Sequence, residues 1–382
     1  MNAILNKLLI VVSLILAFTA CKEEMGKLDS RLSPVKNLIE PANAKAIVLQ
    51  PAVTANLYFE WEACALESSG TALYQIAFDK TNGDFSNPVY VANSDNNGYK
   101  NSVTISHKQM NKIANMMGIG PSASGAFKWT VFSTKGLQTM KAEKENAITI
   151  TRLAGFDDED IPIDVFVTGE ASEGGTDLAK AHKMKAVAGG EFEVYTKLSG
   201  GKQFYFVNDT KGTPKKYSTA NGLVLKEGTS TVPADGIYRI TIDFTTGACT
   251  YTLVTRIGFF FSPSNAILFD LPYIGNGVFQ AKNQKVTFKQ ESWGRDERYK
   301  FRMFVKENAG ADAEKQLEWA TLNQTDSRPT AVSPPSYYYL RLISNLSQWD
   351  NKWKLMADFD DVPATYTIYL QAAQPYTHSI AK

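Results

Sequence analysis

The sequence has few of the residues that metal and redox chemistry require. It contains three cysteines and three histidines, namely His107, His182 and His378, among 382 residues. None of these histidines has a partner at the spacing of a metal site, and no CxxC pair occurs. A glycine-rich phosphate loop and a GxSxG elbow are also lacking. We therefore expect no cofactor, no metal and no catalytic residue, and we interpret the chain as not being an enzyme.

Acidic clusters offer the only alternative to that interpretation. Asp358, Asp360 and Asp361 lie close together, but glycoside hydrolysis needs two carboxylates at a defined separation across a cleft. A turn between strands is the simpler explanation. The acids at 157–160 lack the alternating spacing and the glycine of a calcium loop, and we interpret them as a solvated linker.

Charge of one sign is also scarce. The chain carries 40 Lys and Arg against 39 Asp and Glu, a net charge of +1, and no block of five or more basic residues. Nucleic-acid binding relies on such basic patches, so nucleic acid is not an expected partner.

The start of the chain has the pattern of a secretory signal. Lys7 precedes an apolar run over residues 8–18, and small residues stand directly before Cys21. A run of this length is typical of a cleaved signal and is too short to span a bilayer. Cys21 at the cut predicts a lipoprotein signal peptide over 1–20, with Cys21 lipidated as the anchor. The alternative is a soluble exported protein with an incidental cysteine at this position.

The residues after the cut suit a lipidated tether over 21–36. Glu23 and Glu24 follow Lys22 in a motif that resembles the export tag of outer-membrane lipoproteins in glycan-foraging Gram-negative bacteria. We therefore expect a lipid-anchored outer-membrane protein that faces the cell exterior.

Cys64 and Cys249 remain after cleavage, and we place them in different domains. We expect two buried thiols, and a disulfide formed in an oxidising compartment is the alternative.

Alternation of apolar and polar residues predicts an all-β chain of three tandem β-sandwich domains. The first, 37–152, has strand lengths and turns typical of an immunoglobulin or fibronectin III fold, with a short helix at 108–117. The second and third are expected at 161–254 and 255–382, with related strand layouts.

Particular strands follow from the same pattern. In the first domain Trp61 and Trp129 are expected in the core, on strands at 57–61, 72–78, 127–132 and 147–151. The second domain is expected to end in a hairpin of 236–244 and 248–253. The third is expected to open with a strand at 257–261, to have a middle strand at 299–305, and to end in a hairpin of 353–358 and 365–370.

Short motifs along most of the chain resemble those of the SusE/SusF family of starch-utilisation-system lipoproteins. In order they are 59–61 (FEW), 74–76 (YQI), 127–131 (FKWTV), 165–171 (VFVTGEA), Met184, 190–192 (GEF), 202–206 (KQFYF) and 235–240 (DGIYRI). The resemblance implies a SusE amino-terminal module and two carbohydrate-binding-like domains. It also implies a non-catalytic binder of a polysaccharide or oligosaccharide, at the outer membrane beside a TonB-dependent transporter and its partner lipoprotein.

The tryptophans are distributed unevenly. Residues 161–254 contain none, so this domain is interpreted as a spacer, whereas 255–382 contains four of the six in the chain. Flat aromatic rings bury the C–H faces of sugars, and nearby charged side chains bind the hydroxyls. The predicted glycan-binding residues are Trp293, Trp319, Trp349, Tyr338, Lys300 and Arg302.

Each of these residues also has a structural interpretation. Trp353 shares a strand face with apolar neighbours and is expected in the core, and Lys300 and Arg302 share one face of a strand that could simply be solvated. Tyr338 is expected on a strand, facing opposite Tyr337. The leading alternative function is a structural or assembly subunit of a surface complex that binds protein rather than glycan.

Overall fold

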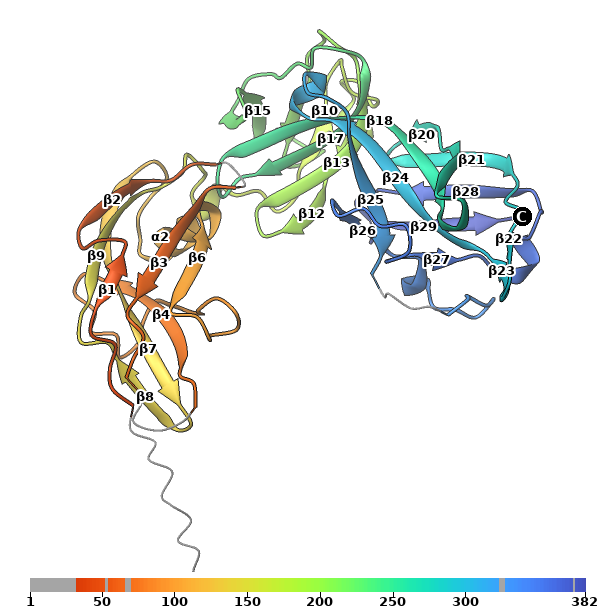
Figure 1. Ribbon diagram of the computed structural model, residues 1–382. Helices are drawn as coiled ribbons and strands as arrows, with labels where there is room; N and C mark the ends of the chain where they lie inside the picture. Colours follow the sequence, from red (N-terminus) through yellow and green to blue (C-terminus); the bar gives the residue numbers. More distant parts are fainter. Residues whose placement is uncertain (1–31, 52–53, 66–69, 323–326, 374) are drawn as a thin grey trace, which may run out of the picture. The chain divides into compact units, whose positions relative to one another are not determined.

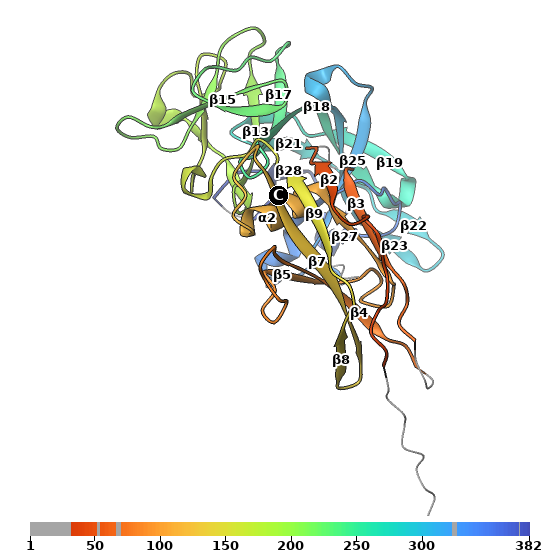
Figure 2. The ribbon, with the colours of Figure 1, turned by 90° about the vertical axis from the view of Figure 1, so that its left-hand side faces the viewer.

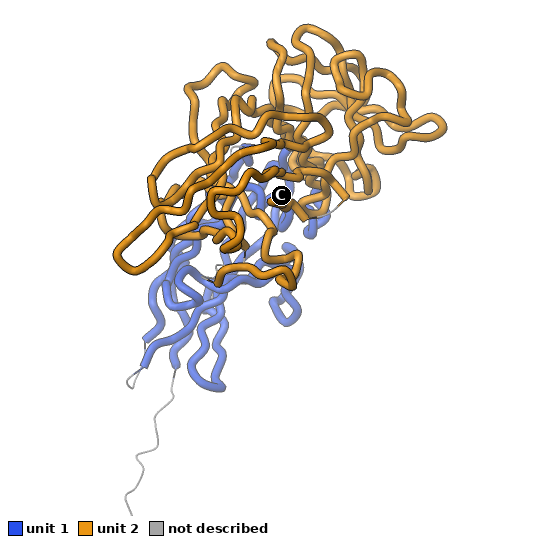
Figure 3. The backbone as a smooth tube through the Cα atoms, turned by 90° about the vertical axis from the view of Figure 1, so that its right-hand side faces the viewer, with its two compact units in different colours: residues 1–153 blue, residues 154–382 orange. Residues whose placement is uncertain are grey.

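The computed structural model describes residues 32–51, 54–65, 70–322, 327–373 and 375–382 (Figure 1). The chain forms two compact units, 1–153 and 154–382, which Figure 3 distinguishes by colour. In the described ranges the fold is all-β with one short α-helix, which confirms the predicted class. No helix in these ranges is long and apolar enough to cross a membrane. The signal peptide and Cys21 lie outside the described residues.

Unit 1 is built from two sheets. One has the order β1-β3-β6, and the other has the order β2-β9-β7-β4-β5, with β8 paired to β7 (Figure 2). The strands are β1 (Leu38–Glu40), β2 (Lys45–Val48), β3 (Asn56–Trp61), β4 (Leu73–Lys80), β5 (Tyr90–Asn93), β6 (Ser102–Ser106), β7 (Ser124–Lys135), β8 (Gln138–Lys141) and β9 (Asn146–Thr151). The predicted strands match β3, β4, β7 and β9.

The core of unit 1 follows from the alternation in these strands. Trp61 and Trp129 are fully buried, as expected, and Phe59 meets Trp129 edge to face at 5.1 Å between ring centroids. Helix α2 (His107–Met116) begins where the Ser106 hydroxyl accepts a hydrogen bond from the Gln109 N–H, a typical N-cap. The predicted helix at 108–117 is therefore present.

The packed chain begins earlier than residue 37. Leu32 and Val35 are buried in the same core, and the Val35 carbonyl accepts a hydrogen bond from the Glu143 N–H at 2.9 Å. Residues 32–36, predicted as part of the tether, thus belong to the folded unit.

The first half of unit 2 is a continuous antiparallel sheet in the order β11-β10-β14-β15-β16-β18-β17-β13-β12. Its strands are β10 (Phe166–Thr168), β11 (His182–Lys183), β12 (Lys185–Ala188), β13 (Glu191–Leu198), β14 (Tyr205–Val207), β15 (Lys216–Ala220), β16 (Leu223–Lys226), β17 (Gly236–Asp243) and β18 (Ala248–Phe261). The predicted hairpin is confirmed, because β17 pairs with β18 across the turn at 244–247.

The acidic linker is attached to this half. Asp160 pairs with Lys226 at 2.7 Å and with Lys215 at 3.2 Å, and both pairs lower the pKa of Asp160. The sequence predicts a solvated linker, but the carboxylate of Asp160 is held by the sheet.

Strand β18 does not stop at residue 254. It pairs with β17 up to Val254 and with β24 (Arg298–Lys306) from Leu253 to Phe261, so one strand serves both halves of unit 2 (Figure 1). The boundary predicted between 254 and 255 falls inside this strand. The strand predicted at 257–261 is the end of β18, and the one predicted at 299–305 is β24.

The second half adds strands to β18 and β24 and packs a separate sheet, β20-β21-β28-β29, beside them. Its other strands are β19 (Ala266–Asp270), β20 (Tyr273–Gly275), β21 (Val278–Gln284), β22 (Lys289–Glu291), β23 (Gly294–Asp296), β25 (Lys315–Thr321), β26 (Leu340–Ile343), β27 (Trp353–Lys354), β28 (Ala364–Tyr369) and β29 (Thr377–Ala381). The predicted last hairpin is wrong, because β27 pairs with β24 whereas β28 pairs with β21 and β29.

Candidate functional site

The structure separates the six predicted glycan-binding residues into exposed and buried ones. Trp293 is 66% exposed and Trp349 is 42% exposed, which leaves both indoles accessible to a ligand. Trp319 is only 1% exposed, Lys300 has no exposure and Arg302 has 9%. Two of the predicted residues, Trp293 and Trp349, are therefore solvent-exposed. Three others, Trp319, Lys300 and Arg302, are too buried for a sugar to reach.

Trp319 is a core residue. It lies on β25, and its ring packs against Tyr195 of the first half and Tyr376 of the second, with centroids 6.1 and 5.8 Å away. The Tyr376 hydroxyl also donates a hydrogen bond of 2.8 Å to Glu193. Trp319 thus helps to join the two halves of unit 2, and its predicted ligand-facing role is wrong. Trp353 is buried at 1%, as expected.

Lys300 and Arg302 share one face of β24, as predicted, but that face is covered. The Lys300 ammonium lies 2.9 Å from Glu318 Oε1, and Arg302 Nε lies 3.0 Å from Glu318 Oε2. Phe260 packs over the Arg302 guanidinium, 4.1 Å from ring centroid to Cζ. Both cations are committed to a buried carboxylate, so neither is available to sugar hydroxyls.

Tyr338 is also placed differently from the prediction. Pro335–Tyr338 forms a 3₁₀ turn rather than a strand, and the half-buried Tyr338 ring meets Tyr337 and His378 edge to face, at 4.9 and 5.2 Å. The Tyr338 carbonyl accepts a 2.9 Å hydrogen bond from His378 Nδ1. Tyr338 therefore supports the core rather than offering a flat exposed ring.

Trp293 is exposed because it lies at the tip of a hairpin. β22 and β23 pair so that Glu291 faces Gly294, which leaves Ser292 and Trp293 as the turn. Gly294 follows with φ +139°, a conformation that residues with a side chain rarely adopt. A turn residue at such a tip has no sheet face to pack on, and its indole extends into solvent.

Trp349 lies in the loop between β26 and β27. Hydrogen bonds from buried charged side chains hold this loop in place. The Lys300 ammonium donates hydrogen bonds to the carbonyls of Ser347 and Asp350, and Arg302 donates to the Ser347 carbonyl at 3.1 Å. The Ser347 hydroxyl accepts the N–H groups of Trp349 and Asp350, at 3.2 and 3.0 Å. The buried triad of Lys300, Arg302 and Glu318 thus positions the loop that carries an exposed indole.

Arg298 lies within interaction distance of both exposed rings. Its guanidinium carbon is 4.4 Å from the Trp349 ring centroid and 5.8 Å from that of Trp293, both within the range of cation–π contact. Asp296 also holds the guanidinium, with Arg298 Nε 2.9 Å from Asp296 Oδ1. Burial raises the pKa of Asp296, but the hydrogen bonds from Arg298 outweigh it and keep that pKa below its usual value. Two exposed rings therefore lie near one cation, and we call this group the Trp293–Arg298–Trp349 platform.

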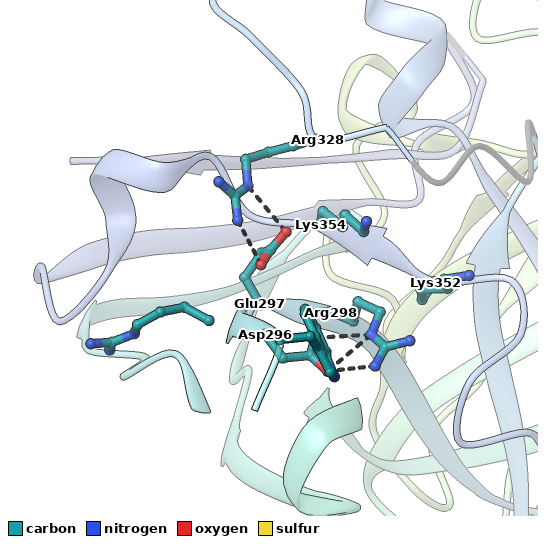
Figure 4. Close-up of a pocket in the computed structure, with 8 residues that line it drawn as sticks. Asp296, Glu297, Arg298, Arg328, Lys352 and Lys354 are labelled. Carbon is teal, nitrogen blue, oxygen red and sulfur yellow. Dashed lines mark hydrogen bonds and ion pairs between the residues drawn. The ribbon is translucent and has the colours of Figure 1, made fainter. Parts of the chain in front are cut away.

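A cavity of about 340 Å³ adjoins this platform (Figure 4). It is lined by one aromatic ring, five cationic side chains and two carboxylates: Trp293, Arg295, Arg298, Arg328, Lys352, Lys354, Asp296 and Glu297. The two carboxylates are buried, with side-chain exposures of 2% for Asp296 and 5% for Glu297. The groups that a ligand meets are therefore mainly hydrogen-bond donors.

Each carboxylate beside the cavity is paired. Glu297 makes a two-point ion pair with Arg328, at 3.0 Å to Nε and 2.8 Å to Nη2, as Figure 4 shows. Asp360 pairs with Arg295 at 2.7 Å and also accepts the Phe288 N–H. Carboxylates fixed in this way position the arginines.

Within the described ranges, no group of three or more His, Cys, Asp or Glu residues could hold a metal ion.

Sequence reasoning missed the five cations around the cavity. Arg298 had a usable signal, because it lies two residues before Lys300 on the same face of β24. The alternation pattern identifies this face of β24. It does not distinguish the end at Arg298, which lines the cavity, from the covered part at Lys300 and Arg302. The other four cations, Arg295, Arg328, Lys352 and Lys354, come from separate segments that only the tertiary fold brings to one cavity, which no local pattern predicts.

A second concavity, of about 580 Å³, lies between the halves of unit 2. Its lining includes Glu173, His182 and Asn276 but no Trp, Tyr or Phe. Glu173 accepts hydrogen bonds from the Lys197 N–H at 2.7 Å and the Asn276 N–H at 3.0 Å, and so ties the halves together. Without a ring to cover a sugar face, this concavity is a weaker candidate.

Comparison with known proteins supports the resemblance seen in the sequence. The model of the SusE outer membrane protein family matches residues 24–132, and the likeness to SusE/SusF proteins is thereby confirmed for the amino-terminal part. Among solved structures, SusF from Bacteroides thetaiotaomicron matches with 11% identity, covering 89% of this chain and 98% of that one, at a TM-score of 0.29. No curated protein sequence matches the chain.

Proposed function

We propose that this protein is a non-catalytic, surface-exposed lipoprotein that captures a polysaccharide or oligosaccharide on the Trp293–Arg298–Trp349 platform. The observation that carries the proposal is the exposure of both indoles around one fixed guanidinium. A sugar-binding platform needs two solvent-exposed rings beside a hydrogen-bond donor. A purely structural subunit has no need to leave two large indoles exposed to solvent.

The strength of such a site can be estimated from area. Covering roughly 100 Å² of apolar sugar face on each ring contributes about 2.5 kcal/mol per ring before the cost of ordering the ligand. The two rings together contribute about 5 kcal/mol, which supports binding near the millimolar range. Weak sites of this kind become effective when the protein is held at a surface and the ligand is a long polymer.

Location and partners are part of the proposal. The match of residues 24–132 to an outer membrane protein family supports outer-membrane placement, and Cys21 after an apolar run supports a lipid anchor. We propose that the protein faces the exterior and works beside a TonB-dependent transporter and its partner lipoprotein. Unit 1 would hold the platform away from the membrane. The first half of unit 2, where residues 161–254 contain no tryptophan, would act as a spacer for the second half.

The test is binding of the chain from residue 25 to 382 to a broad panel of polysaccharides, followed by Trp293→Ala and Trp349→Ala. Each substitution should weaken binding by about tenfold, the equivalent of ~1.4 kcal/mol. Tyr99→Ala is the matched control, because Tyr99 is an aromatic residue of unit 1 that is 55% exposed.

Thermal stability of all three variants should equal that of the parent, since each side chain is exposed. Failure of the panel to retain any polysaccharide would favour the alternative, a subunit that binds protein within a surface complex. Equal losses in the Tyr99→Ala control would show that the platform is not the site.

A further inference from the structure

A second concavity adjoins the loop at 344–352, which carries Trp349. Its volume is about 410 Å³, and we call it the β26 hollow. It is lined by residues of β26 and of this loop: Arg341, Leu342, Ile343, Ser344, Asn345 and Asn351. Lys352, the residue after Asn351, lines the cavity beside the platform. Neighbouring Cα atoms are ~3.8 Å apart, so the linings of the two concavities come within one peptide bond of each other, close to Trp349.

Two side chains of the β26 hollow fix each other. Arg341 donates hydrogen bonds from Nε to the Thr321 carbonyl at 3.0 Å and from Nη2 to Asn351 Oδ1 at 2.6 Å. The Asn351 backbone has φ +56°, a left-handed conformation that asparagine tolerates, and its carbonyl accepts the Thr321 N–H at 3.1 Å. Because Oδ1 is the acceptor for Arg341, the amide Nδ2 of Asn351 is left as a donor at a fixed position.

The free edge of β26 adds backbone groups to the hollow. Among the described strands, β26 pairs only with β25. The Leu340 N–H donates to the Tyr376 carbonyl at 2.8 Å and therefore points away from β25. Alternate residues of an antiparallel strand turn their N–H and C=O groups to the same side. Leu342, two residues further along, thus presents both groups at this edge.

Two exposed polar side chains complete the lining. Within the described part of the chain, neither Ser344 nor Asn345 has a hydrogen-bond partner. Together with Leu342 and Asn351, they offer neutral donors and acceptors side by side. Sugar hydroxyls act as donor and acceptor at once, so groups of this kind match them.

An extended peptide added to β26 is the alternative occupant. Strand addition relies on a row of free N–H and C=O groups along an edge. β26 has only four residues, Leu340–Ile343, and Tyr376 already occupies the outward N–H of Leu340. One residue, Leu342, is left to pair with an added strand, so the hollow suits a sugar better than a peptide.

From these observations we infer that the β26 hollow is a second sugar subsite, and that the ligand is a glycan chain bound along its length across the Trp349 loop. The inference rests on the proposed function and specifies its ligand as a chain of several sugar units. Units on the platform cover the rings of Trp293 and Trp349. Further units of the same chain reach Leu342, Ser344 and Asn345.

The test is the dependence of affinity on chain length. Malto-, cello- and xylo-oligosaccharides of three and six units are titrated into the chain from residue 25 to 382. In the series that binds, the hexamer should bind at least tenfold more tightly than the trimer, because each added hydrogen bond raises affinity about two- to tenfold. The hexamer should also slow hydrogen exchange of the Leu342 N–H.

Variants locate the gain. The double variant Ser344→Ala, Asn345→Ala should weaken hexamer binding about tenfold and leave trimer binding and the melting temperature unchanged, since both side chains are exposed. Trp349→Ala should weaken trimer and hexamer alike. Gln138→Ala is the matched control, because Gln138 is an exposed amide on β8 of unit 1.

The outcomes separate this inference from the proposed function. Equal affinity for trimer and hexamer, or an unchanged hexamer affinity in the double variant, would overturn the subsite and leave glycan capture on the platform intact. Lack of binding to all three series would also overturn it, and a polysaccharide panel without a hit would overturn the proposed function as well. A peptide of alternating threonine and valine probes strand addition. If this peptide protects the Leu342 N–H from exchange and the hexamer does not, the hollow accepts a strand and the inference is wrong.

Discussion

Removing the carboxylate of Glu318 tests how the platform is held. Glu318 has no exposure and is the counter-charge for two buried cations, with Lys300 at 2.9 Å and Arg302 at 3.0 Å. Glu318→Gln keeps the shape of the side chain and removes its charge. We expect a large loss of stability around β24 and β25, because two cations stay buried without their partner.

The size of the loss follows from the burial of the triad. Breaking a buried ion pair by removing one partner costs about 3–5 kcal/mol, and here the partner serves two cations. A whole domain is stable by only about 5–15 kcal/mol, so this change is a large fraction of the total. Lys300→Met combined with Glu318→Gln should cost less than the sum of the two single changes, since one stranded cation is then gone.

Protonation gives an independent check on the same reasoning. Burial lowers the pKa of Lys300, and Glu318 raises it part of the way back. Without Glu318 the pKa of Lys300 falls further below the value of about 10.4 in the unfolded chain. The unfolded state then binds more protons, so the stability of Glu318→Gln rises with pH and should partly recover between pH 7 and 10.

Native-state hydrogen exchange of peptides that cover β24 and β25 measures this local stability without assuming a single unfolding transition. Trp349→Ala serves as the control, because it changes an exposed side chain in the loop that the triad holds. A loss under 1 kcal/mol in Glu318→Gln, or no recovery at high pH, would show that the triad is not a buried electrostatic unit.

Three further predictions concern the core of the molecule. Burial lowers the pKa of His378 to about 3, below its unfolded value of about 6.5, so stability present above pH 6.5 is lost as pH falls. We expect a loss of about 2 kcal/mol between pH 7 and 5 in hydrogen exchange of β29, and a flatter pH dependence in His378→Phe. Trp319→Ala should destabilise unit 2 by about 3–5 kcal/mol, seen as a lower melting temperature, because it leaves a cavity between Tyr195 and Tyr376. Cys249 is a free buried thiol whose pKa burial raises to about 12, so it should react with a disulfide reagent only after denaturation.

The sequence predicts elements whose pattern is local. The strands of unit 1 alternate apolar and polar residues, and this alternation places Trp61 and Trp129 in the core. Helix α2 can also be predicted from the sequence, because its apolar residues recur at helical spacing after Ser106. Both thiols were expected to be buried, and Cys64 and Cys249 are free and buried.

Features that depend on distant segments were not predictable in this way. Alternation correctly put Lys300 and Arg302 on one face of β24, but it could not show that Glu318 and the loop at 344–352 cover that face. The continuity of β18 was missed for a related reason. A strand that changes partners at Val254 has no turn signal to mark the change.

The tryptophans show what decides whether an aromatic side chain is exposed to solvent. Trp319 directly follows Glu318 in the sequence yet lies in a strand, where pairing with β24 and β26 carries its ring into the core. Trp293 and Trp349 occupy a turn and a loop, where backbone geometry leaves no sheet face to cover the ring. The exposed rings are nevertheless fixed, because Arg298 and the Lys300–Glu318 pair hold the segments around them. Exposure and rigidity together reduce the cost of ordering the site on binding, so a platform of only two rings can still retain a ligand.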